Sequence, residues 1–305
     1  MDVTGQVLVL FLLILFGYAA RKARILDDAA LGHFSAFVAN ITLPALIVVS
    51  LQRPFSRGLL GSAAATLGLS VAVYAFSFAV AAVYPSLIRA GKKERGVQRY
   101  AIIFSNVGFM GFPVVEAVLG GDALFNLAIY NIPFYFLAFS VGAWLIARDG
   151  KRPLLLTWRT FVNPSVAATL VGIAFFLLSV KLPAPLHRAL KLTGDATSPL
   201  SMIVIGAILA RMDPRAVVGR WRNFVTTAVR LVVLPAAVYA ALYALGLRGL
   251  LLALPVLVVA MPVAANATLL ANLYEGDTES ASAMVFISTL ACVATIPAIA
   301  LLFAG

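Results

Sequence analysis

Apolar residues occur along this chain in long blocks rather than at short helical or strand periods. Ten stretches of 17 to 27 residues alternate with short polar connections. A membrane-spanning helix needs about 20 apolar residues. The pattern therefore predicts an all-α integral membrane protein of ten transmembrane helices. The predicted spans are 5–21, 33–51, 58–84, 100–119, 124–147, 161–180, 194–210, 224–246, 250–272 and 280–303.

The composition supports a membrane protein and excludes a soluble one. The 305 residues are 62% hydrophobic and 11% charged, and the mean hydropathy is +1.01. A soluble domain cannot bury so much apolar surface. The polar connections are too short to fold separately, so we expect a single membrane domain. It divides into residues 1–147, a short cytoplasmic connection at 148–160, and residues 161–305.

The net charge of +11 is explained by topology rather than by nucleic acid. Sixteen of the 23 Lys and Arg residues fall in alternate connections that begin with Arg21, Lys22 and Arg24, six fall in the opposite connections, and Arg230 lies in a span. Cytoplasmic connections carry the excess of basic residues. Both termini are therefore expected outside. Asp2 precedes the first apolar run where a signal peptide has Lys or Arg, so we expect a span and not a cleaved leader.

The two halves of the chain match at an offset of 155 residues. The identities are Gly17 with Gly172, Thr42 with Thr197, Pro44 with Pro199, and Gly121-Asp122 with Gly276-Asp277. Five spans in each half is an odd number, so the second half must be inverted in the membrane. Inverted five-helix repeats are typical of secondary transporters.

Spans four and nine are both interrupted near their middle. Residues 105–113 read SNVGFMGFP and residues 260–268 read AMPVAANAT. Pro113 lacks a backbone donor and Gly108 and Gly111 weaken the helix, so we expect unwound backbone between Asn106 and Phe112. In inverted halves the second half-helices point their positive N-terminal ends at each other near the midplane, which favours an anion. The alternative is a pair of packing kinks.

Other polar residues at related depths extend the candidate site. Spans two and seven contain NITLP at residues 40–44 and DATSP at 195–199, where a packing kink is an equal alternative. An amide in span five either bonds a neighbouring helix or touches substrate. The substrate-binding candidates are Asn106, Gly108, Gly111, Pro113, Pro262, Asn266, Asn40, Thr42, Thr197, Ser198 and Asn131.

Three ionisable residues lie in or near the spans. Glu116 follows Pro113 by one turn, and a carboxyl at membrane depth suggests proton coupling, although the outer interface is close by. Asp195 has the same two readings. Arg230, two turns into span eight, is expected to snorkel to the cytoplasmic surface, with an internal partner as the alternative.

Several of these motifs resemble the bacterial auxin efflux carrier family. The resemblance covers essentially the whole chain and is carried by NVGFMGFP at 106–113, MPVAAN at 261–266, VFIST at 285–289, TIP at 295–297, Leu43-Pro44 and Asn163-Pro164. It implies a fold similar to that of the bile acid sodium symporters, with crossing broken helices four and nine. It also implies a carrier of mono- or dicarboxylates that works by alternating access. Asn106, Pro113, Pro262 and Asn266 would surround the substrate carboxylate.

The expected partners are a small organic anion and the lipid bilayer of a bacterial cytoplasmic membrane, with a homodimer left open. No cofactor or metal is expected, because the only Cys is Cys292 and the two His stand apart. Coupling to Na⁺ or H⁺ and uniport are all open. An enzyme is not expected, since no nucleophile has a base partner. A non-transporting ligand sensor or assembly protein with the same fold is the alternative function.

Overall fold

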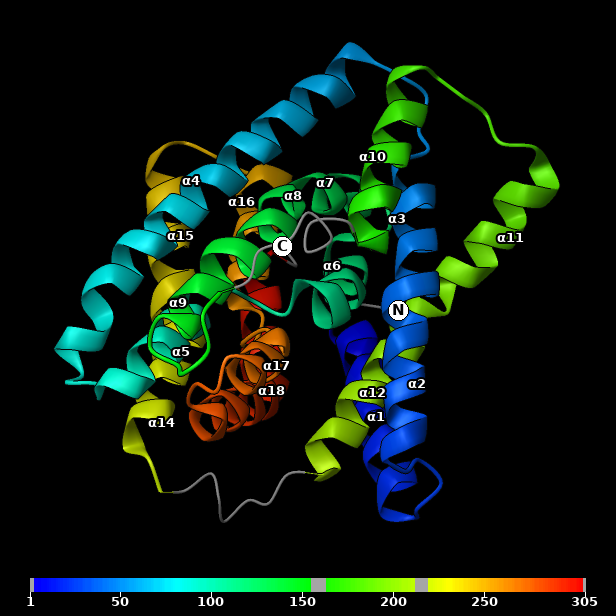
Figure 1. Cartoon of the computed structure of the whole chain (residues 1–305). Helices are drawn as coiled ribbons and strands as arrows, with labels where there is room; N and C mark the ends of the chain where they lie inside the picture. The colour runs from blue at the N-terminus through cyan, green and yellow to red at the C-terminus, as the bar shows by residue number, and fades with distance from the viewer. Residues whose placement is uncertain (1–2, 155–162, 212–218, 304–305) are drawn as a thin grey trace.

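The computed structural model describes residues 3–154, 163–211 and 219–303, and the described residues are organised as helices (Figure 1). The predicted connection at 148–160 and the start of span six lie partly outside them. The α-helices are α1 Val3–Lys22, α2 Asp28–Phe37, α3 Leu43–Leu51, α4 Arg57–Leu87, α5 Lys92–Ile103, α6 Phe112–Leu119, α7 Ala123–Tyr130, α8 Ile132–Leu137, α9 Ala143–Ala147, α10 Pro164–Leu177, α11 Ala184–Asp195, α12 Thr197–Arg211, α14 Trp221–Ala228, α15 Leu234–Ala244, α16 Leu250–Ala260, α17 Asn266–Leu273 and α18 Thr278–Ala300.

Seven helical stretches in the described part of the chain are long and apolar enough to cross a membrane. They coincide with predicted spans one, two, three, five, seven, eight and ten. Spans four, six and nine contain shorter apolar helices, Val107–Leu119, Pro164–Leu177 and Leu250–Ala260. The chain is thus a multi-pass membrane protein, and the full set of ten crossings in an inverted repeat stays a prediction.

Span seven is longer than the sequence pattern indicates. The residues before it were assigned to an outer connection, but they form α11, which continues into α12 as a helical stretch from Ala184 to Arg211. Figure 1 shows α11 reaching outward at the right edge of the molecule. The sequence of α11 mixes basic and apolar residues. It therefore lacks the continuous apolar run by which the spans were recognised.

A π-helical turn at Ala138–Gly142 has no proline after it, but the other three π-helical turns of the described residues each end two residues before a proline. These turns are Val38–Thr42 before Pro44, Val107–Gly111 before Pro113, and Val229–Val233 before Pro235. Proline has no N–H and its ring clashes with the carbonyl four residues earlier. Widening the preceding turn by one residue relieves that clash without ending the helix. The prolines therefore reshape these spans rather than break them.

The true breaks are two extended stretches, residues 104–106 and 261–265, which pair with each other. The Asn106 N–H donates to the Pro262 carbonyl at 2.8 Å, and the Ala264 N–H donates to the Phe104 carbonyl at 3.1 Å. Ser105 and Val263 form an antiparallel bridge. In span four the unwound residues lie earlier than the predicted Asn106 to Phe112. The reason is that the Asn106 side chain accepts the Phe109 N–H and restarts a helix at Val107.

Helices α1 and α12 lie side by side at the lower right of Figure 1 because glycines let their backbones touch. A Cβ on Gly206 would lie 1.9 Å from the Ile14 carbonyl oxygen, and a Cβ on Gly17 would lie 2.0 Å from that of Ile203. Small residues allow such close approach where no hydrophobic effect drives helix association in lipid.

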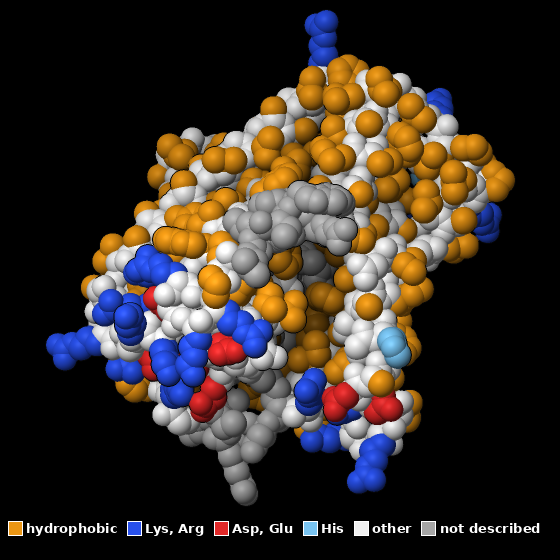
Figure 2. Space-filling view, in the orientation of Figure 1, with side chains coloured by type: hydrophobic (Ala, Val, Ile, Leu, Met, Phe, Trp, Pro, Cys, Tyr) orange, Lys and Arg blue, Asp and Glu red, His pale blue; other side chains and the backbone are white. Residues whose placement is uncertain are grey.

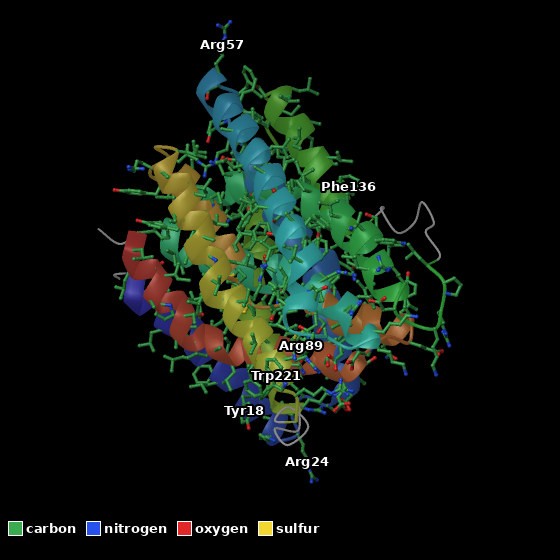
Figure 3. All side chains as sticks on the ribbon, turned by 90° about the vertical axis from the view of Figure 1, so that its left-hand side faces the viewer. Tyr18, Arg24, Arg57, Arg89, Phe136 and Trp221 are labelled. Carbon is green, nitrogen blue, oxygen red and sulfur yellow. The ribbon has the colours of Figure 1, made fainter. Side chains whose placement is uncertain are left out.

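Charged side chains gather toward one end of the molecule, the lower end in Figure 2. Figure 3 places Arg24 at this end and Arg57 at the opposite one. Arg24 belongs to the connections predicted to be cytoplasmic and Arg57 to those predicted to be outside. The distribution agrees with the charge bias that orients membrane proteins.

Gly206→Ala should destabilise the protein, because its new methyl group has no room against the α1 backbone. We expect a loss of about 1–3 kcal/mol, the usual cost of overpacking, measured as a lower melting temperature in detergent. Gly68→Ala in α4 is the matched control, since a Cβ there meets nothing within 4 Å. Equal melting temperatures for the two variants would contradict the tight α1–α12 contact.

Arg57→Cys should react with a membrane-impermeant maleimide on intact cells, whereas Arg24→Cys should react only after permeabilisation. Both arginines are exposed, and the natural Cys292 is buried, so the unmodified chain is the background. The reverse labelling pattern would invert the orientation derived from the basic residues.

Candidate functional site

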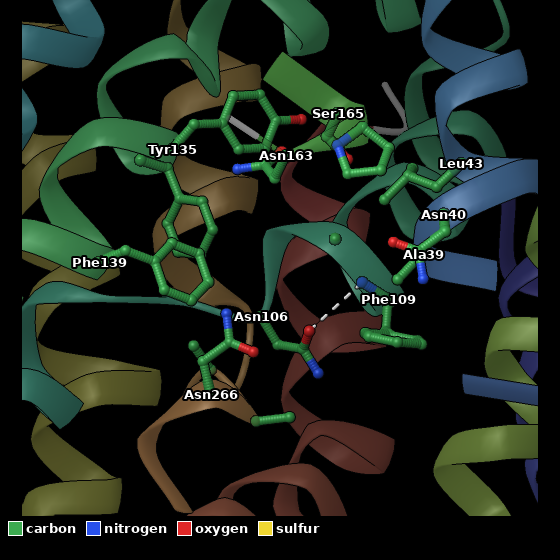
Figure 4. A pocket seen from close by; sticks show the side chains of 15 residues that line it. Ala39, Asn40, Leu43, Asn106, Phe109, Tyr135, Phe139, Asn163, Ser165 and Asn266 are labelled. Carbon is green, nitrogen blue, oxygen red and sulfur yellow. Dashed lines mark hydrogen bonds between the residues drawn. The ribbon is translucent and has the colours of Figure 1, made fainter. Parts of the chain in front are cut away.

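A cavity of about 180 Å³ lies beside the crossing of the two broken spans. Its walls come from the α2–α3 stretch, the α8 region, the start of α10 and the two extended segments (Figure 4). Ligand pockets for drug-sized molecules measure roughly 300–1,000 Å³, so this cavity suits a smaller molecule. The polar side chains on its lining are Asn40, Asn106, Tyr135, Asn163, Ser165 and Asn266.

Three helices begin at this cavity. The helix that runs from Val107 through α6 begins after Asn106, α17 begins at Asn266, and α10 begins at Pro164 after its cap Asn163. The first residues of all three line the cavity. A helix N-terminus carries roughly half a positive charge from aligned peptide dipoles and unpaired N–H groups. Among the described residues the lining contains no Lys, Arg or His, so the positive potential that we expect in the cavity comes from these helix ends.

The capping asparagines have a structural task as well as a place on the lining. The Asn106 Oδ1 accepts the Phe109 N–H at 3.3 Å, drawn as a dashed line in Figure 4, and the Asn163 Oδ1 accepts the Val166 N–H at 3.0 Å. Each cap uses the side-chain oxygen, which leaves the amide Nδ2 donor for another partner. Donors of this kind suit a carboxylate, which accepts hydrogen bonds only.

Aromatic rings form the apolar part of the wall. Phe109, Tyr135 and Phe139 line the cavity, and Figure 4 shows Tyr135 and Phe139 on one side and Phe109 opposite. Polar donors beside an apolar wall are typical of sites that orient a small ligand with a charged group and a carbon skeleton.

The structure brings four of the predicted substrate-binding residues together on the lining: Asn40, Asn106, Gly108 and Asn266. The remaining candidates do not line this cavity. Pro262 belongs to the crossing, where its carbonyl accepts the Asn106 N–H. Thr42, Thr197 and Asn131 are fully buried among helices, and Gly111 and Pro113 lie in the turns that follow the crossing. A contact of these residues with substrate stays a prediction.

Residues 163–165 are the part of the lining that sequence reasoning did not assign to the site. Asn163-Pro164 was noted only as a motif that resembles the carrier family. The Asn-Pro pair is a typical helix start, and the described α10 has only 14 residues. The sequence therefore carried a signal for a helix start at this position, but none that placed this start at the cavity.

Glu116 and Asp195, the predicted coupling residues, lie off the lining. The half-buried Glu116 carboxylate accepts a hydrogen bond from Ser198 Oγ at 3.0 Å, which links α6 to α12. Asp195 pairs with Lys191 at 2.9 Å, and its side chain is 47% exposed. A role in proton coupling stays a prediction for both.

Arg230 does not snorkel to the surface. Its residue is 1% exposed, and it is among the largest fully buried side chains in the described part of the protein. The expectation from its place two turns into span eight was wrong, because the guanidinium points into the protein and bonds two backbone carbonyls. Among the described residues, no group of three or more His, Cys, Asp or Glu side chains is placed to hold a metal ion.

Known proteins resemble this chain along nearly its whole length. A family model described as membrane transport protein matches residues 2–154 and 152–300. A Rhizobium meliloti protein named "Putative malonate transporter" is 28% identical over 97% of this chain and 94% of its own length. The Escherichia coli "Uncharacterized transporter YfdV" is 25% identical over 96% and 95%. The Arabidopsis thaliana "Auxin efflux carrier component 1" is 34% identical over 36% of this chain and 18% of that protein.

Asn106→Asp should weaken anion binding at least tenfold while leaving the protein folded. A carboxylate still caps the helix at Phe109, but it adds a negative charge to the cavity; tenfold corresponds to about 1.4 kcal/mol. Calorimetric titration of the purified protein with malonate measures the effect. Ser56→Asp is the control, because Ser56 caps α4 in the same way outside the cavity. Equal affinities in both variants would remove Asn106 from the site.

Proposed function

Because the chain belongs to the membrane transport protein family of the auxin efflux carriers, we propose that it is a secondary transporter of small organic anions. The observation that carries this proposal is the convergence of three helix N-termini on one cavity. Helix N-termini are a general device for binding anions. Discontinuous helices that point their N-terminal ends at an anionic substrate are found in transporters with related architecture.

Mono- and dicarboxylates are the substrates that fit best. Three helix ends supply roughly +1.5 charges in total, at about half a charge each. This value lies between the charges of a mono- and a dicarboxylate. The small cavity volume favours a short carbon skeleton, and a full-length relative is named for malonate. Malonate is therefore the first substrate to test.

A second, smaller cavity supports alternating access across the crossing. It measures about 30 Å³ and lies between α12, α18 and the crossing. Asn106, Phe109 and Ala265 line both cavities. These residues form a shared wall, so a substrate that passes from one cavity to the other must move past Phe109. In the proposed cycle the larger cavity closes as the smaller one opens.

The runner-up function is a ligand sensor or assembly protein that uses the same fold without transport. It predicts binding of the anion without flux. For the coupling of transport, we propose Glu116 and Asp195 as the carboxyls to test for a proton-driven cycle. Glu116 lies on α6 and Asp195 on α11, and both helices pack against α12. Neither carboxyl lines the cavity.

Proteoliposomes that contain the purified protein should take up labelled malonate saturably. Asn106→Ala and Asn266→Ala should each lower uptake at low substrate at least tenfold, because each removes an amide donor at a helix start; tenfold equals about 1.4 kcal/mol of transition-state stabilisation.

Asn272→Ala is the matched control for this assay, since Asn272 lies on the same helix α17 but is exposed and off the lining. Undiminished uptake in both cavity variants would reject the proposed site. Malonate binding without any uptake by the unmodified protein would favour the sensor.

A further inference from the structure

Arg230 places a positive charge inside the membrane domain, and no carboxylate among the described residues pairs with it. It lies in the wide turn Val229–Val233 of the span Trp221–Ala244, where it is 1% exposed. A buried, unpaired guanidinium in a membrane protein is costly, so its presence requires a compensating interaction.

Backbone carbonyls provide that interaction. The Arg230 Nη1 donates to the Ile102 carbonyl at 2.6 Å, and Nε donates to the Met261 carbonyl at 3.4 Å. Ile102 is in the last turn of α5, which ends at Ile103, and Met261 directly follows α16, which ends at Ala260. One side chain thus bonds the C-terminal ends of both first half-helices at the crossing.

The crossing therefore has a negative side as well as a positive one. Each helix C-terminus carries roughly half a negative charge on its unpaired carbonyls. Two such ends meet beside Arg230, and their sum of about −1 matches one guanidinium. In transporters with broken helices, unwound carbonyls and half-helix C-terminal ends are the groups that coordinate a coupling Na⁺ ion.

Arg230 is separate from the anion site. It lines neither the 180 Å³ cavity nor the 30 Å³ cavity that share Phe109. Its Nη2 is buried with no hydrogen-bond partner among the described residues. A substrate in either cavity therefore does not contact this guanidinium.

We propose that Arg230 is a built-in cation of the crossing, which neutralises the two half-helix C-terminal ends, groups of the kind that coordinate Na⁺ in other transporters with broken helices. This inference rests on the proposed transport function and adds to it that anion carriage by this chain is independent of Na⁺. Arg230 is accordingly a positioning residue: it holds the Ile102 and Met261 carbonyls at the ends of α5 and α16, from which the two extended segments lead to the cavity.

The first test compares ionic conditions for malonate uptake by proteoliposomes at fixed pH and zero membrane potential. The unmodified protein should transport equally in Na⁺ and in choline. Arg230→Gln should take up malonate at least tenfold more slowly, because two helix ends lose their counter-charge. Each such interaction contributes about tenfold in a partly buried setting. Arg230→Lys, which keeps the charge, should retain more uptake than Arg230→Gln.

Chemical rescue separates a missing cation from a missing side chain. Millimolar guanidinium should restore uptake to Arg230→Ala, which has space for it, and should not affect the unmodified protein. Arg248→Ala is the matched control, since the exposed Arg248 also donates to two backbone carbonyls, those of Tyr243 and Leu247. It should keep its uptake within about twofold, as surface substitutions usually do.

Stability provides a readout that does not depend on transport. In detergent, guanidinium should raise the melting temperature of Arg230→Ala above its value in choline, while the Arg248→Ala value should not change. If the unmodified protein carries no anion but this rescue occurs, the transport function fails and the built-in cation stands. Sodium-stimulated uptake by the unmodified protein, full uptake by Arg230→Gln, or no response of Arg230→Ala to guanidinium would overturn the inference.

Discussion

The two hydrogen bonds that join residues 104–106 to residues 262–264 are the constraint on which the rest of this structure depends. Unwound backbone cannot be left unsatisfied inside a bilayer, so a broken span survives only if another part of the protein supplies its partners. Here each broken span supplies them for the other. Val263 receives further help, because its N–H donates to Ser288 Oγ at 3.0 Å. Neither break would be stable without its counterpart.

This mutual pairing also sorts the electrostatics of the membrane interior. Because the two broken spans cross where each helix stops and restarts, the C-terminal ends of α5 and α16 lie on the side of Arg230, and the N-terminal ends after Asn106 and Ala265 face the cavity. Backbone direction alone separates a negative region from a positive one. α10 adds a third positive end by beginning at the same cavity.

Sequence patterns identified the two interrupted spans and the amides beside their breaks, because Gly, Pro and Asn have local effects that need no knowledge of the fold. In span four the break itself lies at residues 104–106, ahead of the Gly and Pro residues from which it was predicted. Both of these amides, Asn106 and Asn266, line the cavity. The π-helical turns were not predicted, since a proline equally permits a kink or a break. The start of α10 at the cavity and the carbonyl partners of Arg230 depend on how distant spans pack. The residues next to 163–165 and 230 in the sequence do not indicate which distant segments these positions contact. For Arg230, hydropathy therefore favoured a position at the membrane surface.

The origin of the positive charge in the cavity has a consequence for its response to acidity. The described lining residues include no Asp, Glu, His, Lys or Arg, and the positive field of the helix ends comes from peptide dipoles that do not take up or release protons. A site built from histidine or lysine would lose attraction for anions as these groups deprotonate. The contribution of these peptide dipoles does not change with pH, so the ionisation state of the arriving carboxylic acid sets how strongly the helix ends hold it.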